Sequence, residues 1–167
     1  MQALSTIIVD DEDLARRGLA LRLKQIPGIE IVAECSNGRQ ALQAIAEHEP
    51  DLLFLDIQMP GMDGFQVLSE LQADTLPMVV FVTAYDTYAV DAFKVHAVDY
   101  ILKPIDEERL GEAVERARQF NAQRASARDK AKLMNLVMGM TGANAQTVEA
   151  MAESGRQGWP EKLTVRD

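Results

Sequence analysis

The chain has 167 residues, 47% of them hydrophobic, which is sufficient for one α/β domain with an appended segment. No stretch approaches the roughly 20 consecutive apolar residues of a membrane helix, and the first residues lack the basic segment of a secretory signal. Cys35 is the single cysteine, which excludes an intramolecular disulfide and a cysteine-based zinc site. We therefore expect a buried Cys35 in a protein of the reducing cytoplasm, without membrane association.

Charge is distributed unevenly along the chain. The formal net charge is −9, but residues 1–120 hold 21 acidic against 10 basic residues, whereas residues 121–167 hold 5 acidic against 7 basic residues. An acidic body repels the phosphates of nucleic acid. The sequence therefore predicts that this part of the protein does not bind DNA by itself.

Short apolar runs typical of strands alternate with amphipathic segments typical of helices as far as residue 120. The runs lie at residues 4–9, 29–33, 52–55, 78–82 and 100–102. This alternation predicts an α/β fold, a flavodoxin-like (βα)5 three-layer sandwich. Right-handed crossovers leave few topologies. We expect a parallel five-stranded sheet in the order 2-1-3-4-5, with ligands bound outside the carboxyl ends of its strands.

The helices are predicted from apolar residues at helical spacing. In the first helix these residues are Leu14, Gly18 and Leu21. A short alanine-rich helix is expected at residues 87–95, and Asp106 is placed to cap the last helix. The second, third and last helices carry Ala41, Leu42 and Ile45, then Phe65, Leu68 and Leu71, then Leu110, Val114 and Ala117.

Beyond residue 122 the composition changes, and four parts are predicted for the whole chain. Residues 1–122 form the α/β domain, 123–140 extend its last helix, 141–160 form a polar linker, and 161–167 begin a further strand. The extension carries an apolar stripe of Leu133, Leu136, Val137 and Met140. This stripe packs on its own domain or pairs with a second chain, and we favour the second chain because the domain core is complete without it.

Chemically capable side chains follow four of the five predicted strands. Asp10 and Asp11 follow the first, Asp56 the third, Thr83 the fourth and Lys103 the fifth. Each of them alone has a plain explanation as a helix cap, a turn residue or a surface lysine. Because the carboxyl ends of parallel strands meet at one edge of a sheet, we expect these side chains to converge on one crevice.

The chemistry of such a convergence is a phosphoryl transfer assisted by a metal ion. Three neighbouring carboxylates repel one another unless a hard dication lies among them, and oxygen ligands suit Mg²⁺. One carboxylate, Asp56, can then attack phosphorus and form an acyl phosphate. Lys103 supplies an ammonium and Thr83 a hydroxyl for the phosphoryl oxygens, while the small Ala84 leaves room for the group.

Four stretches of the sequence resemble the receiver domains of two-component response regulators: residues 9–12, 55–64, 82–85 and 99–105. The resemblance covers about residues 3–122 and is specific in combination. It implies that Asp56 is the phosphoacceptor and that a sensor histidine kinase is the phosphoryl donor. It also implies a switch of transcriptional output, with no catalysis beyond the chain's own phosphorylation and dephosphorylation.

The same resemblance implies individual roles at the site. Asp11 would bind Mg²⁺ directly, Asp10 would reach it mainly through water, and the backbone carbonyl of Gln58 would complete the protein ligands beside Asp56. Thr83 and Tyr100 match the family's switch pair, in which the hydroxyl moves toward the phosphate and the aromatic ring turns inward.

Further implications concern the last strand and the partners. Lys103 would pair with the phosphate, and the bond between Lys103 and Pro104 is a candidate for the cis state. The family dimerises through its fourth helix, fifth strand and fifth helix.

Residues 83–93 and 97–100 are similar to receivers joined to LytTR-type DNA-binding domains, and residues 162–166 fit the opening strand of such a domain. DNA would then be bound only through an output domain that this chain does not contain.

Three other functions remain as alternatives. A phosphatase of the haloacid dehalogenase kind needs a second acid two residues after its nucleophile, where this chain has Gln58. A flavodoxin needs a hydroxyl- and glycine-rich phosphate loop after the first strand, where residues 10–13 are four consecutive acids. A receiver that acts without any output domain is the third alternative.

Overall fold

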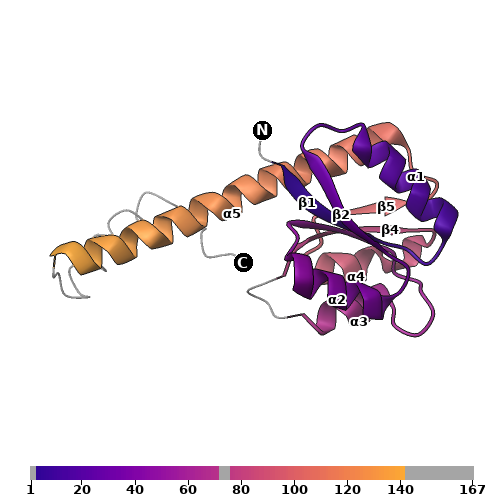
Figure 1. Cartoon of the computed structure of the whole chain (residues 1–167), viewed down its shortest axis with the longest axis horizontal. Coiled ribbons are helices and arrows are strands. Elements are labelled where there is room, and N and C mark those ends of the chain that lie inside the picture. Colours follow the sequence, from indigo (N-terminus) through magenta and orange to yellow (C-terminus); the bar gives the residue numbers. More distant parts are fainter. Residues whose placement is uncertain (1–2, 72–75, 142–167) are drawn as a thin grey trace. The chain divides into compact units, whose positions relative to one another are not determined.

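The structure is a computed structural model that describes residues 3–71 and 76–141. The chain divides into two compact units, residues 1–121 and residues 122–167. The strands of the first unit are β1 (Leu4–Val9), β2 (Ile29–Cys35), β3 (Leu52–Leu55), β4 (Met78–Thr83) and β5 (Asp99–Leu102). All neighbouring pairs are parallel and the order is β2-β1-β3-β4-β5, which confirms the predicted flavodoxin-like sheet (Figure 1).

The helices follow the strands in the predicted alternation. They are α1 (Asp13–Lys24), α2 (Gly38–His48), α3 (Gly64–Ser69), η2 (Asp86–Tyr88), α4 (Ala89–Lys94) and α5 (Glu107–Thr141). The segment predicted as one helix at 87–95 begins with a single 3₁₀ turn, η2, before α4. Asp106 caps α5 as predicted, because its Oδ2 accepts a hydrogen bond from the backbone N–H of Arg109 at 3.1 Å.

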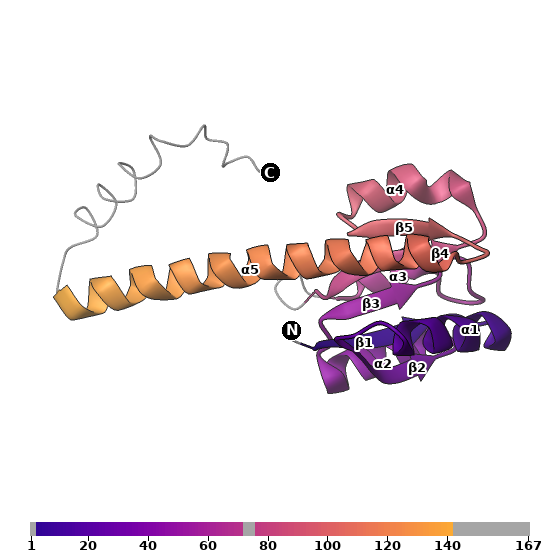
Figure 2. The ribbon, with the colours of Figure 1, turned by 90° about the horizontal axis from the view of Figure 1, so that it is seen from above.

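Two apolar layers enclose the sheet, one on each face. Helices α1 and α5 cover one face, and α2, α3 and α4 cover the other (Figure 1). Seen from above, the strands lie side by side beneath α1 and the first part of α5 (Figure 2). The predicted residues of α5, Leu110, Val114 and Ala117, are all buried. Cys35 is also buried as expected.

The predicted helix α1 is present, but the apolar residues from which it was predicted do not form its buried face. Leu14 is 83% exposed and Leu21 is 64% exposed. Three other residues of the helix contact the sheet: Leu19, Ala20 and Leu23. Both sets have helical spacing, so periodicity alone could not choose between them.

A buried ion pair ties β5 to α5 and fixes the chain next to Tyr100. The carboxylate of Asp99 accepts hydrogen bonds from both terminal nitrogens of Arg109, at 2.8 and 2.6 Å, and lies 3.1 Å from Arg116. Arg109 also donates to the carbonyl of Tyr100 at 3.0 Å. Burial alone would raise the pKa of Asp99, but these bonds to arginine outweigh it and lower the pKa.

The described part of the second unit, residues 122–141, is helical and belongs to α5, which confirms the predicted long C-terminal helix. Leu133 is 60% and Leu136 is 56% exposed, so these residues of the apolar stripe are open to a partner. The side chain of Met140, the linker beyond residue 141 and the strand predicted at 161–167 lie outside the described residues. Within the part of the chain that is described, no helix has the length and apolarity needed to cross a bilayer.

Candidate functional site

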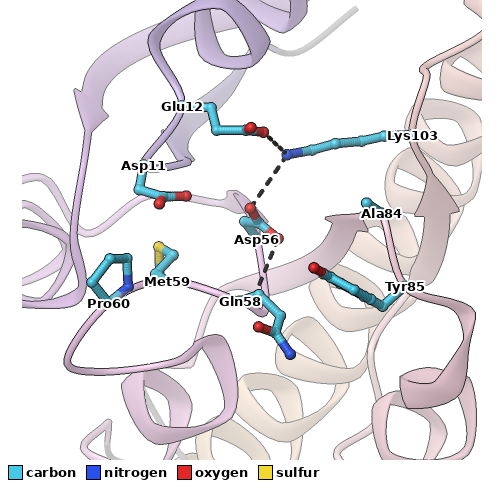
Figure 3. A pocket seen from close by; sticks show the side chains of 9 residues that line it. All are labelled: Asp11, Glu12, Asp56, Gln58, Met59, Pro60, Ala84, Tyr85 and Lys103. Carbon is cyan, nitrogen blue, oxygen red and sulfur yellow. Dashed lines mark hydrogen bonds and ion pairs between the residues drawn. The ribbon is translucent and has the colours of Figure 1, made fainter.

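The carboxyl ends of β1, β3, β4 and β5 surround a cavity of about 460 Å³, shown in Figure 3. Residues on its walls include Asp11, Glu12, Asp56, Gln58, Ala84, Tyr85 and Lys103. Side chains from four separate strand ends therefore meet at one place. Asp11, Asp56 and Lys103 converge here as expected from the sequence, whereas Thr83 is fully buried and is not among the residues that line the cavity.

Three carboxylates form an acidic cluster in this cavity. Asp10, Asp11 and Asp56 each offer one oxygen, and these oxygens lie within 4.8 Å of one another. Asp10 and Asp56 are each 4% exposed, whereas Asp11 is open to solvent. Arg16 of α1 donates to the backbone carbonyl of Asp10 at 2.8 Å and thereby fixes the loop that carries two of the three acids. This hydrogen bond from Arg16 could not be predicted from the sequence.

The ammonium of Lys103 lies among these acids. Its Nζ is 2.8 Å from Asp10 Oδ2, 3.1 Å from Glu12 Oε1 and 3.3 Å from Asp56 Oδ2. Burial alone would lower the pKa of Lys103, but the hydrogen bond to Asp10 and the charges of Asp56 and Asp10 raise it, so the group is positively charged. The peptide bond between Lys103 and Pro104 is cis, as predicted.

The positive charge of Lys103 only partly offsets the effect of burial on the pKa of Asp56. Burial raises the pKa of its carboxyl to about 6; the charge of Lys103 opposes the rise and the charge of Asp10 adds to it. Its Oδ1 accepts a hydrogen bond from the backbone N–H of Gln58 at 3.3 Å. An additional positive charge at the cluster would stabilise the ionised carboxylate.

Thr83 and Tyr100 both contact the segment that follows β4. Thr83 is fully buried, and its hydroxyl oxygen accepts a weak hydrogen bond from the backbone N–H of Tyr85 at 3.4 Å. The hydroxyl of Tyr100 donates to the backbone carbonyl of Tyr85. Burial raises the pKa of Tyr100, which keeps this hydroxyl protonated as a donor. A movement of the Tyr85 backbone would therefore affect both side chains.

Gly64 packs closely against the backbone of Asp56, the candidate phosphoacceptor. A Cβ at this position would lie 2.7 Å from the carbonyl oxygen of Asp56 and 3.1 Å from the Cα of Ile57. Both are backbone atoms, which cannot move without shifting the strand end. Since the N–H of Gly64 also donates to the carbonyl of Ile57 at 2.9 Å, the start of α3 and the end of β3 fit only when residue 64 lacks a side chain.

Gly64→Ala is accordingly expected to lower the free energy of unfolding by about 1–3 kcal/mol, the cost of overpacking. Gly111→Ala is the matched control, because a Cβ at Gly111 has no neighbour within 4 Å. Alanine in the interior of α5 should raise stability by about 0.5–1 kcal/mol. Urea denaturation followed by circular dichroism measures both. Equal stabilities of the two variants would contradict the contact described for Gly64.

The donor set of the acidic cluster fits a hard divalent cation. It consists of oxygens alone, it carries three potential negative charges, and one of its members, Asp56, has a pKa raised by burial and by the charge of Asp10. Mg²⁺ prefers carboxylate oxygens together with retained waters, and the exposed Asp11 leaves the cluster open to solvent. The residues present therefore suit Mg²⁺.

Comparison with known proteins agrees with the fold. Residues 6–115 match the response regulator receiver domain, so the chain belongs to the receiver domain family of two-component response regulators. In structure it is similar to the response regulatory domain of protein mrkE from Klebsiella pneumoniae, with a TM-score of 0.65 and 33% identity over 72% of this chain and 99% of that one.

Two curated response regulators are similar to part of this chain. An uncharacterised response regulatory protein of Yersinia pestis is 53% identical over 113 residues, 68% of this chain and 48% of the relative. The transcriptional regulatory protein BtsR of Escherichia coli is 48% identical over 116 residues, 70% of this chain and 48% of BtsR. The chain thus spans about half the length of the curated relatives that it matches.

Proposed function

We propose that Asp56 accepts a phosphoryl group from a sensor histidine kinase and that this modification switches a transcriptional regulator. The observation that carries the proposal is the position of Asp56, with one carboxylate oxygen 3.3 Å from the ammonium of Lys103 and within the acidic cluster. A carboxylate oxygen attacks phosphorus as the bond from phosphorus to the donor's imidazole nitrogen breaks, and the product is an acyl phosphate. Lys103 neutralises charge on the phosphoryl oxygens.

The proposed metal ligands are the carboxylates of Asp11 and Asp56, the backbone carbonyl of Gln58, and Asp10 through water. Mg²⁺ bound there would supply charge neutralisation for the transferring phosphoryl group. Asp10 would also position Lys103. Its Oδ2 lies 2.8 Å from the Lys103 Nζ and holds that ammonium beside Asp56.

The proposed output passes through Thr83 and Tyr100. After phosphorylation the Thr83 hydroxyl turns to a phosphoryl oxygen and the ring of Tyr100 moves inward. Dimerisation then follows through α4, β5 and the first part of α5, with the extension of α5 at residues 123–140 as a second contact. The name of BtsR, a transcriptional regulatory protein, supports an output of this kind. A LytTR-type DNA-binding domain outside this chain would bind the DNA, in the cytoplasm.

Acetyl phosphate and Mg²⁺ should add one phosphoryl group to the chain, and EDTA should prevent the addition. Asp11→Asn removes a charged ligand and should raise the Mg²⁺ concentration needed for half-maximal labelling by about 10–100-fold. Intact-protein mass spectrometry over a Mg²⁺ titration measures both effects. Labelling in EDTA at the rate seen with Mg²⁺ would contradict the proposed metal site.

A further inference from the structure

The side chain of Gln58 separates two cavities. One is the cavity at Asp56, and the other, of about 230 Å³, lies between the loop after β3 and Tyr88. The backbone N–H of Gln58 faces Asp56, but its carboxamide points away from that carboxylate (Figure 3). The carboxamide nitrogen donates a hydrogen bond to the hydroxyl of Tyr88 at 2.5 Å. Gln58, two residues after Asp56, is thus held by a residue that follows β4.

The side chain of Tyr88 is held in place by two aromatic neighbours. Its ring packs against Phe65 of α3, with centroids 6.1 Å apart, and meets the ring of Tyr85 edge-on at 6.4 Å. It is the last residue of η2, which follows β4 and Thr83. An aromatic side chain has only two torsions and gives up little entropy when its ring is packed. The fixed Tyr88 therefore positions the long and exposed Gln58, and not the reverse.

We propose that Tyr88 is a positioning residue that holds the Gln58 carboxamide out of the cavity at Asp56 and so lengthens the life of the phosphoryl group there. The inference rests on the proposed function. In hydrolysis, a water oxygen attacks phosphorus, the bond from phosphorus to Asp56 breaks, and Asp56 leaves as a carboxylate. The water proton passes to solvent and inorganic phosphate is released.

A carboxamide inside the cavity would speed this step. Its oxygen can accept a hydrogen bond from the attacking water and orient that water toward phosphorus. Gln58 is the nearest side-chain amide to do so, because only one residue separates it from Asp56. With its nitrogen bound to Tyr88, the group cannot reach the water.

Tyr88→Phe tests the proposal, because it removes the hydroxyl and keeps the ring that packs on Phe65. The full 167-residue chain is labelled with acetyl phosphate and Mg²⁺, the donor is removed, and the loss of label is followed by mass spectrometry. Since a hydrogen bond of this kind contributes about 0.5–1.5 kcal/mol, loss of label should accelerate about 2–10-fold. Equal decay of wild type and Tyr88→Phe would overturn the proposal.

Gln58→Met is the matched control, because methionine has a similar length and no amide. The double variant Tyr88→Phe/Gln58→Met should lose label at the rate of Gln58→Met, because without the carboxamide the Tyr88 hydroxyl has no group to hold. Acceleration that persists in the double variant would show that Tyr88 acts without Gln58 and would overturn the proposal. Failure of the wild-type chain itself to take label would instead overturn the proposed function and this inference together.

A second readout needs no phosphoryl group. Urea unfolding of the wild type, both single variants and the double variant gives the coupling between the two side chains. The hydrogen bond predicts a coupling of at least about twofold in the folding equilibrium constant. Additive effects of the two substitutions would show that the bond does not hold Gln58 in solution and would overturn the proposal independently of any labelling.

Discussion

Asp56→Asn is expected to abolish uptake of a phosphoryl group from acetyl phosphate by the chain in the presence of Mg²⁺. Asparagine has nearly the same shape, but its amide cannot attack phosphorus to form an acyl phosphate. The neighbouring acid cannot take its place easily, because Asp10 is held by Lys103 at 2.8 Å and by the backbone N–H of Glu12 at 2.9 Å. Intact-protein mass spectrometry should therefore show unmodified protein only.

The matched control for this loss is Asp129→Asn. Asp129 is an exposed residue of α5, so the same chemical change there leaves the site untouched. Asp129→Asn should take up label at the wild-type rate. Stable labelling of Asp56→Asn to the wild-type level would place the phosphoacceptor at another residue.

Asp56→Asn should also make the protein more stable when no metal is bound. Burial raises the pKa of Asp56 to about 6 from an ordinary value of 3.8. A carboxyl whose pKa is raised by folding binds its proton more tightly in the folded state, so stability falls as the pH rises from 3.8 through about 6. A shift of this size corresponds to at most about 3 kcal/mol at pH 7. Asp56→Asn removes this cost.

In EDTA at pH 7, urea denaturation should accordingly show Asp56→Asn to be about 1–3 kcal/mol more stable than the wild type. The difference should shrink as the pH falls toward 4, because the wild-type carboxyl becomes protonated. Mg²⁺ at 100 times its dissociation constant should stabilise the wild type by about 2.7 kcal/mol and the variant by less. A variant less stable than the wild type in EDTA would contradict the electrostatics described for the site.

The sheet and the acidic cluster could be predicted because they depend on order along the chain. Five apolar runs separated by helices leave few topologies, and a parallel sheet brings the strand ends together. Asp56, directly after the buried β3, and Lys103, directly after β5, are placed by this topology alone. Their side-chain contact at 3.3 Å follows from neighbours that the sequence already specified.

Contacts that depend on side-chain direction could not be predicted. The bond between Gln58 and Tyr88 joins residues 30 positions apart through two loops whose paths have no periodic signal. The buried face of α1 could not be chosen from the sequence, because Leu14 and Leu19 both belong to sets with helical spacing. The need for glycine at position 64 arises from a 2.7 Å approach to a backbone oxygen, which only the folded chain reveals.

The most direct measurement of the central claim is the location of the phosphoryl group. Borohydride reduces an aspartyl phosphate to homoserine, so reduction of the labelled chain followed by peptide mass spectrometry identifies the acceptor residue. The proposed function predicts homoserine at position 56, formed only when Mg²⁺ and acetyl phosphate are both present. Homoserine at Asp10 or Asp11, or a phosphoryl group recovered on a residue other than an aspartate, would contradict it.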